Sequence, residues 1–431
     1  MAVSTIFIAF SLMLAIMLIG MPIAVVMALA GIVGGVLAFG WPLVQSMGPV
    51  VWGVQNANLL TAIPLFILLG ELLLRSGIAD RMYGALSLWF GGLPGGLLHT
   101  NIGCCALFSA TSGSSVATAA TVGTVAMPTL RARGYDSARS LGSLAAGGTL
   151  GILIPPSVNL LIYGSMAEQS IGQLFVAGIV PGALLTGLFM IYIALSHWRS
   201  YEKPAEAVPL RVKIAALEAL IPPIVIFVIV IGSIYMGIAT PTESAALGVM
   251  TALVFVILHK RLSLDFLERC FTQTAKTTGM VLLIVTTAFV LNVTLSLTGV
   301  AQAMTGWITS LGLSPTGLLL ALIVFYLVLG MFMDVLSMQV LTIPIAVPVV
   351  TAVGIDPVWF GIFVVLMCEL GLITPPVGMN LYVVHGVRLD GGPFSDVVRG
   401  AIPYALIMLV FTLLLIAFPE IVLWLPRTMY G

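Results

Sequence analysis

The sequence contains Gly151-Ile-Leu-Ile-Pro-Pro-Ser157, and a similar stretch, Gly371-Leu-Ile-Thr-Pro-Pro-Val377, follows at an offset of 371 − 151 = 220. A double proline removes two backbone donors and blocks continuation of a helix, so carbonyls of the preceding turn lose their partners. In a membrane such a break is tolerated only where it is buried in protein or lines a water-filled cavity. One copy alone would favour a simple proline kink. Two copies at matching places predict a binding site built from broken helices.

The composition is that of a polytopic membrane protein. Of 431 residues, 60% are hydrophobic and 7% are charged, whereas about 25% are charged in soluble globular proteins. Sixteen basic residues balance sixteen acidic ones, so the net charge does not indicate a nucleic-acid partner. No basic residue precedes the first apolar run, which argues against a cleaved signal peptide. The chain is therefore expected to be surrounded by lipid.

Apolar runs that could cross a bilayer, which takes about 20 residues, occur in both halves of the chain. The expected spans are 3–20, 22–39, 59–74, 137–163 and 173–197, followed by 214–236, 244–259, 277–297, 358–385 and 401–425. Further short matches recur at offsets close to 220, for example Ser76-Gly-Ile-Ala79 and Thr298-Gly-Val-Ala301. Several such matches together indicate an internal repeat. The predicted units are repeat one at 1–197, a linker at 198–213, repeat two at 214–425 and a tail at 426–431.

Equivalent loops of the two repeats carry different charge. The loop that contains Arg131 and Arg133 is basic, and its counterpart at 351–357 has no basic residue. Conversely, 164–172 has no Lys or Arg, whereas its counterpart carries Arg388 and Arg399. Since basic loops stay in the cytoplasm, the two repeats are predicted to be inverted, with the linker cytoplasmic and both termini periplasmic.

Between the third and fourth spans of each repeat lies an apolar stretch. For the predicted orientation of the spans to hold, this stretch has to begin and end on the same side of the membrane. These stretches, 94–130 and 315–350, are predicted to be re-entrant helical hairpins with turns at 111–115 and 330–334. The segments before them, 78–90 and 300–311, are short or polar and are predicted to be arm helices that lie along the membrane interface. The fold class is thus all-α, with about ten spans, two hairpins and two broken helices at 137–163 and 358–385.

Hydroxyl and carbonyl oxygens gather at the hairpin turns and the double prolines, and oxygen ligands are what hard cations prefer. A sodium ion is therefore expected in each half. The candidates for the first sodium site are Ser112, Gly113, Ser114, Gly151, Pro155, Pro156 and Ser157. The candidates for the second are Gly330, Asp334, Gly371, Thr374, Pro375, Pro376 and Gly378. Helix N-termini beyond each break attract anions, so a carboxylate substrate is expected between the two sites, at Ser115, Asn159, Asp334 and Asn380.

Two carboxylates stand out in apolar sequence. Asp334 is flanked by Met333 and Val335, and because an acid in a membrane segment is costly, its default interpretation is functional, the alternative being a buried hydrogen-bonded acid. Glu369 lies two residues before Gly371. It could orient the broken helix or accept hydrogen bonds from a hairpin, and a scaffold role is equally open.

Catalytic and cofactor signals are missing from the sequence. The four histidines are scattered, and the four cysteines lack metal-ligand spacing. No Gly-rich phosphate loop with a lysine is present either. We therefore expect no cofactor, with sodium as the only metal ion.

At this point the residues resemble those of the large membrane subunit of TRAP (tripartite ATP-independent periplasmic) transporters. The resemblance covers essentially the whole chain and rests on these motifs: Ser112-Gly-Ser-Ser-Val-Ala-Thr118, Arg133-Gly-Tyr-Asp136, Gly148-Thr-Leu-Gly-Ile-Leu-Ile-Pro-Pro-Ser157, Gly237-Ile-Ala-Thr-Pro-Thr-Glu243 and Gly371-Leu-Ile-Thr-Pro-Pro-Val-Gly378. It implies a sodium-driven elevator importer of organic acids, such as C4-dicarboxylates or sialic acids, in a bacterial inner membrane. It also implies two partners, a small four-helix membrane subunit and a soluble periplasmic substrate-binding protein.

Two other functions remain open. One is a sodium/carboxylate symporter that works without a binding protein, which uptake measured with and without an added binding protein would separate. The other is an intramembrane enzyme, which would need a catalytic cluster that the sequence does not contain.

Overall fold

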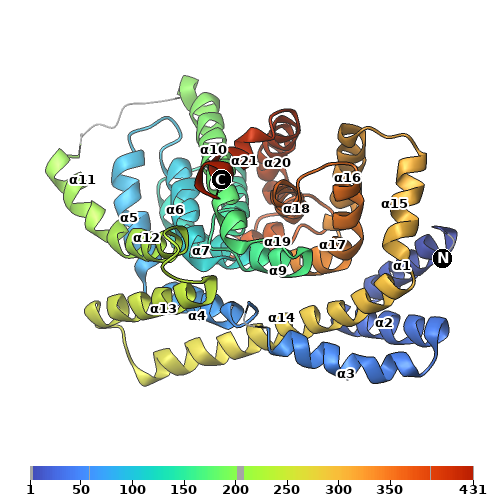
Figure 1. Ribbon diagram of the computed structural model, residues 1–431. Helices are drawn as coiled ribbons and strands as arrows, with labels where there is room; N and C mark the ends of the chain where they lie inside the picture. The colour runs from blue at the N-terminus through green and yellow to red at the C-terminus, as the bar shows by residue number, and fades with distance from the viewer. Residues whose placement is uncertain (1–2, 58, 201–207, 389, 431) are drawn as a thin grey trace.

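The structure, a computed structural model, describes residues 3–57, 59–200, 208–388 and 390–430 (Figure 1). Over these ranges the chain forms helices and no strands, as the predicted all-α class requires. Residues 201–207 of the predicted linker, and residue 431 of the predicted tail, lie outside the described ranges.

Within these ranges the first half contains ten α-helices and two short 3-10 turns, at Thr149–Gly151 and Trp198–Ser200. The helices are α1 (Val3–Leu18), α2 (Ile23–Phe39), α3 (Pro42–Gln55), α4 (Ala62–Arg75), α5 (Ile78–Phe90), α6 (Leu97–Ser112), α7 (Ser115–Ala132), α8 (Ser137–Gly148), α9 (Val158–Ala167) and α10 (Ile171–His197).

The second half repeats much of this order and contains a 3-10 turn, at Leu217–Leu220 between its first two helices. Its described helices are α11 (Leu210–Ala216), α12 (Ile221–Tyr235), α13 (Pro241–Leu258), α14 (Leu264–Leu297), α15 (Val300–Ser310), α16 (Pro315–Gly330), α17 (Val335–Ala352), α18 (Pro357–Leu372), α19 (Met379–Gly386), α20 (Phe394–Ala417) and α21 (Glu420–Tyr430). Helix starts recur at nearly constant offsets: 335 − 115 = 220 for α7 and α17, 357 − 137 = 220 for α8 and α18, and 300 − 78 = 222 for α5 and α15.

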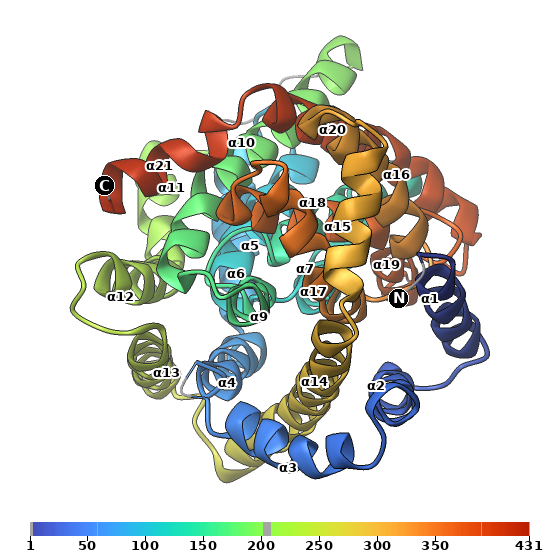
Figure 2. The ribbon, with the colours of Figure 1, turned by 45° about the vertical axis from the view of Figure 1, so that its right-hand side comes forward.

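Many of the described helices lie in two layers. One layer, here called the outer layer, consists of α2, α3, α4, α13 and the long α14, which runs along the bottom of Figure 1. Within it α14 packs against α2, α3 and α4, and α13 packs against α4. The other layer, here called the core, consists of α6 to α9 and α16 to α19. Figure 2 labels all of these helices except α8, and the labelled ones lie above the outer layer.

Among the described residues, six helices are long and apolar enough to cross a membrane, or up to eight if each of two bent pairs counts as one span. The bent pairs are α4 with α5, at 65°, and α15 with α16, at 118°. The sequence predicts ten spans. Five predicted spans are not among the six helices: the breaks divide 137–163 and 358–385, and α1, α2 and α4 have only 16, 17 and 14 residues. One of the six, α17, belongs to the predicted hairpin 315–350.

Three helical segments differ from the sequence prediction. Helix α14 begins at Leu264 rather than 277, since the Ser263 hydroxyl caps it and Arg269 pairs with Asp265 at 3.0 Å within its polar first turns. The sequence does not predict helix α3, and Pro42 stands at its start, where a missing N–H costs nothing. The expected span 401–425 is divided at Phe418, because the following Pro419 disfavours helical backbone there.

The two halves are interlocked rather than placed side by side. Helix α8 of the first half packs along α20 of the second, and Gly142 faces Gly400 where neither could carry a Cβ atom. The Tyr163 hydroxyl donates to the Pro357 carbonyl at 2.5 Å. Contacts of this kind hold both broken helices in one core.

Candidate functional site

In both hairpins the helix after the turn is capped by a side chain. Helix α6 ends at Ser112, Gly113 takes a positive φ of 60°, and the Ser114 hydroxyl caps α7 by accepting from the Ala117 N–H at 3.4 Å. In the second half, the Asp334 carboxylate caps α17 by accepting from the Ser337 N–H at 3.2 Å and from the Ser337 hydroxyl. The two caps are related by the repeat offset, 334 − 114 = 220.

Both broken helices are interrupted at the double prolines. In the first, α8 ends in a 3-10 turn, and α9 begins after Ser157, whose hydroxyl accepts from the Leu160 N–H at 3.3 Å. In the second, α18 ends at Leu372, and α19 begins after Gly378, which has a positive φ of 55°. The Pro155–Pro156 and Pro375–Pro376 peptide bonds are cis.

Each hairpin turn touches the break of its own half. A Cβ on Gly151 would lie 2.5 Å from the Cα of Ser115, and a Cβ on Gly113 would lie 3.0 Å from the Pro156 carbonyl oxygen. In the second half, a Cβ on Gly371 would lie 2.6 Å from the Cα of Gly330. The structure therefore brings together the residues that are predicted from separate motifs.

These glycine contacts predict a steric effect. We expect Gly151→Ala and Gly371→Ala each to destabilise the core by about 1–3 kcal/mol, because the added methyl group overlaps the hairpin turn. Thermal unfolding in detergent measures the effect. The control is Gly187→Ala in α10, where nothing lies within 4 Å of the added methyl group. Wild-type stability of both test variants would contradict the close approach.

Glu369 of α18 joins the two halves at this site. Its side chain is fully buried, and Oε1 accepts from the Ser115 hydroxyl and from the Ile152 N–H, the latter at 3.3 Å. Its other oxygen, Oε2, has no hydrogen-bond partner among the described residues. One carboxylate from the second half thus holds both the hairpin turn and the break of the first half.

A cavity of about 770 Å³ lies between the outer layer and the core. The core contributes the first hairpin turn, Asn159 of α9, and Asp334 with the start of α17. The outer layer contributes residues of α2, α4 and α14. Ser115, Asn159 and Asp334, three of the predicted substrate-binding residues, line this cavity.

Asn380, the fourth predicted substrate-binding residue, does not line it. Its side chain is fully buried close to Gly148, and neither amide atom has a partner among the described residues.

Two predicted sodium-site residues have hydroxyls that form hydrogen bonds within the protein. Thr374 donates to the Leu370 carbonyl at 2.6 Å, and Ser112 shares a 2.9 Å hydrogen bond with Thr118.

Ser337 is a site residue that sequence reasoning missed. It lines the cavity and donates to Asp334. The signal was present as an acidic N-cap followed three residues later by a polar side chain, a spacing typical of helix starts. Gln339, two residues further along α17, is fully buried with both amide atoms unpartnered among the described residues, and it does not line the cavity.

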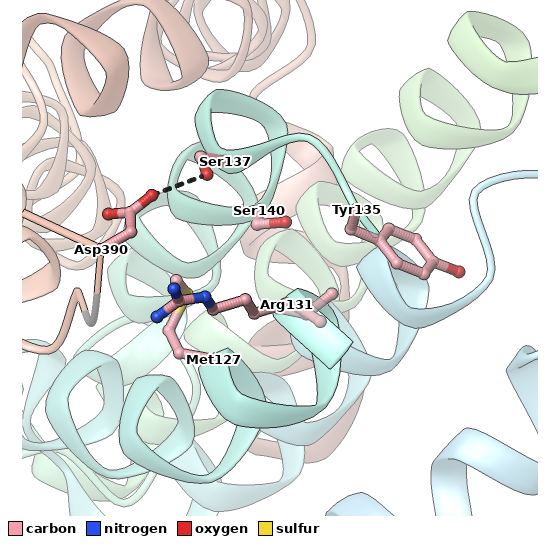
Figure 3. Close-up of a pocket in the computed structure, with 7 residues that line it drawn as sticks. Met127, Arg131, Tyr135, Ser137, Ser140 and Asp390 are labelled. Carbon is pink, nitrogen blue, oxygen red and sulfur yellow. Dashed lines mark hydrogen bonds between the residues drawn. The ribbon is translucent and has the colours of Figure 1, made fainter. Parts of the chain in front are cut away.

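A second, smaller cavity of about 60 Å³ lies between α7, α8 and the loop before α20 (Figure 3). Figure 3 shows Asp390 turned toward Ser137, which donates to it at 3.2 Å, with Arg131 below them. Arg388 pairs with Asp390 and, at 2.9 Å, with Asp396. Hydrogen bonding from Arg388 holds the pKa of Asp390 well below its usual range, so this cluster stays charged at neutral pH and braces the loop.

The sequence matches a known family over residues 10–421, the DctM component of tripartite ATP-independent periplasmic transporters. It is 36% identical over 394 residues to the C4-dicarboxylate TRAP transporter large permease protein DctM of Pseudomonas aeruginosa, covering 91% of this chain and 92% of that one. It is 34% identical over 381 residues to the sialic acid TRAP transporter large permease protein SiaM of Vibrio cholerae, covering 88% of each. The ectoine TRAP transporter large permease protein TeaC of Halomonas elongata is 30% identical, covering 96% and 97%.

The fold also resembles a solved structure. The Alcanivorax borkumensis YdaH transporter superposes with a TM-score of 0.60, covering 92% of this chain and 97% of that one at 15% identity. That likeness concerns the fold alone. From the family match and the relatives together, the chain belongs to the DctM family, the large permeases of TRAP transporters.

Proposed function

We propose that this chain is the large permease subunit of a sodium-coupled importer that carries an organic acid across a bacterial inner membrane. The observation that carries the proposal is the 770 Å³ cavity, which is lined by the first hairpin turn and the start of α17 on one side and by the outer layer on the other. A site placed between two layers can be opened to either side of a membrane when one layer moves against the other.

The movement we propose is that of an elevator. The core, with both hairpins and both breaks, slides against the outer layer while α5 and α15 act as the arm helices that connect them. The repeated helix offsets near 220 and the reversed loop charge support two inverted repeats, 1–197 and 214–425, with both termini in the periplasm.

Each half is proposed to bind one sodium ion where its hairpin turn meets its break. Gly113, beside the Pro156 carbonyl, marks the first site, and Gly330, beside Gly371, marks the second. Each ion would stabilise only the arrangement in which the turn and the break converge, and this differential affinity is what couples ion binding to movement.

Two partners are part of the proposal: a small membrane subunit and a soluble periplasmic substrate-binding protein. The family is that of tripartite transporters, which supports three components. This chain covers 64% of the isethionate TRAP transporter permease protein DctMQ of Oleidesulfovibrio alaskensis, so that relative contains further sequence. Lipid surrounds the complex, and no nucleic acid is involved.

The test is uptake into proteoliposomes that contain this chain and the small subunit, driven by a sodium gradient. We expect uptake of an organic acid only when both sodium and the cognate binding protein are present. Uptake that needs sodium but not the binding protein would favour the simple sodium/carboxylate symporter. Uptake that is unchanged without sodium would refute the coupling. The family assignment favours a transporter over an enzyme, so no product other than the imported acid is expected.

A variant pair tests the two ion sites. We expect Ser112→Ala and Thr374→Val each to raise the sodium concentration for half-maximal uptake by roughly threefold to tenfold, which corresponds to the ~1 kcal/mol of one hydrogen-bonding oxygen. The matched control is Thr251→Val. The Thr251 hydroxyl, like that of Thr374, donates to the carbonyl four residues earlier, here at 2.8 Å, but it lies on an exposed helix face. Unchanged sodium dependence in both test variants would count against the two-site arrangement.

A further inference from the structure

The lining of the 770 Å³ cavity indicates which class of organic acid fits. Its charged lining residues are Glu71 and Asp334, and none of the described residues that line it is Lys, Arg or His. Glu71 is already paired with Arg75 at 2.9 Å. A bound anion therefore finds no basic side chain, and the positive groups available to it are the ends of helices and any bound cations.

Most of those helix ends are on the core side, and on the other side the start of α2 contributes Ile23 and Ala24. The first turns of α7, α9, α17 and α19 contribute Ser115, Asn159, Leu336 and Met379 to the lining. Asn159 is 7% exposed, and its Oδ1 has no hydrogen-bond partner among the described residues. A side-chain amide can turn either its oxygen or its NH₂ toward a ligand, so Asn159 can donate to a carboxylate that lies at these helix ends.

The opposite wall is mainly apolar. Helices α4 and α14 contribute Ile67, Met280, Leu283 and Ile284. The polar residues on this side are engaged with one another or with neighbours: Gln273 donates to Thr277 at 3.3 Å, and Glu71 pairs with Arg75. A second carboxylate on the same ligand, placed against α4 and α14, would lose its hydration without gaining a partner, which is costly.

We propose that the preferred cargo of this site is a monocarboxylate with an apolar body, held by its carboxylate on the core and by its hydrocarbon part against α4 and α14. This inference rests on the proposed function and narrows it. It also fits the movement, because an apolar wall without directional bonds lets the cargo leave with the core while a polar wall would hold it back.

Ligand binding to the purified full chain in sodium-containing nanodiscs tests this without the partners. The probes are 2-oxopentanoate and 2-oxopentanedioate, which share a 2-oxo acid head and differ in the methyl or carboxylate at the far end. The zwitterion leucine serves as a third probe. We expect 2-oxopentanoate to bind at least ~10-fold more tightly than the other two, a difference that calorimetry resolves easily.

A gain-of-function variant makes the test sharper. Met280 lies in the apolar wall with 54% of its surface exposed, so a lysine can replace it without entering the packed interior. Met280→Lys is expected to reverse the preference toward 2-oxopentanedioate, whereas Met280→Gln, of similar size and uncharged, should leave the preference for the monocarboxylate.

The outcomes distinguish an error in the cargo class from an error in the proposed function. If the wild-type chain binds 2-oxopentanedioate or leucine as tightly as 2-oxopentanoate, or more tightly, the cargo class is overturned. The proposed transport function is not affected by that result. Failure of Met280→Lys to shift the preference, with wild-type binding intact, removes α14 from the cargo site and overturns the proposed orientation. No binding of 2-oxopentanoate in the presence of sodium also overturns the cargo class, whereas the proposed function is overturned only if the proteoliposomes show no sodium-driven uptake of organic acids.

Discussion

Replacing Glu369 with alanine is expected to abolish uptake, whereas Glu369→Gln should retain a substantial part of it. Alanine leaves the Ser115 hydroxyl and the Ile152 N–H buried without their acceptor, at about 1–3 kcal/mol for each unsatisfied group. The first hairpin turn and the first break then lose the side chain that holds them together. Glutamine keeps an oxygen in the place of Oε1 and can accept both hydrogen bonds.

The Glu369 variants are compared by their uptake rates. The amount of folded protein is first made equal for each variant, as judged by its size-exclusion profile. The control is Glu268→Ala, an exposed glutamate on α14 that should transport normally. Ser115→Ala removes one of the two donors and should give an intermediate rate, with little further loss when combined with Glu369→Ala. If Glu369→Gln is as inactive as alanine, the negative charge and not the acceptor geometry is what transport needs. Normal uptake by Glu369→Ala would refute the role.

Asp334→Asn is expected to abolish or greatly weaken sodium-driven uptake while leaving folding nearly unchanged. Asparagine is as good a helix N-cap as aspartate, so the bond from the Ser337 N–H to the side-chain oxygen is preserved and α17 still starts at Val335. What the substitution removes is the negative charge in the cavity, which is proposed to bind the cation. Asp334→Ala should lose the cap as well, at about 1 kcal/mol.

The chain offers a matched control for this charge. Asp356 caps α18 by accepting from the Val358 N–H at 2.8 Å and the Trp359 N–H at 3.1 Å, and it does not line the cavity. Asp356→Asn should therefore transport like the wild type. Sodium-dependent uptake and thermal unfolding, measured on both variants, separate loss of the site from loss of the cap. Wild-type uptake by Asp334→Asn would exclude the carboxylate from the ion site.

Local chemistry made much of the site predictable from the sequence. The double prolines predicted interrupted helices because proline lacks an N–H wherever it stands, and Gly113 was predicted in a turn because glycine accepts a positive φ of the kind observed, 60°. The membrane class followed from an apolar fraction too large for a water-soluble chain. Asp334 was predicted to be functional because a carboxylate in an apolar membrane segment is energetically costly. Each of these properties belongs to a residue and its near neighbours.

Only the tertiary structure decided which of these residues share a surface. Ser115 and Glu369, far apart in the sequence, meet because α18 of one half packs against the break of the other. Asn159 and Asn380 occupy equivalent positions, at an offset of 380 − 159 = 221, yet Asn159 lines the cavity while Asn380 is enclosed beside Gly148. Sequence repetition makes two residues equivalent within their repeats, but the packing around them differs, because α9 packs against α4 of the outer layer whereas α19 packs against α7 and α8 of the core.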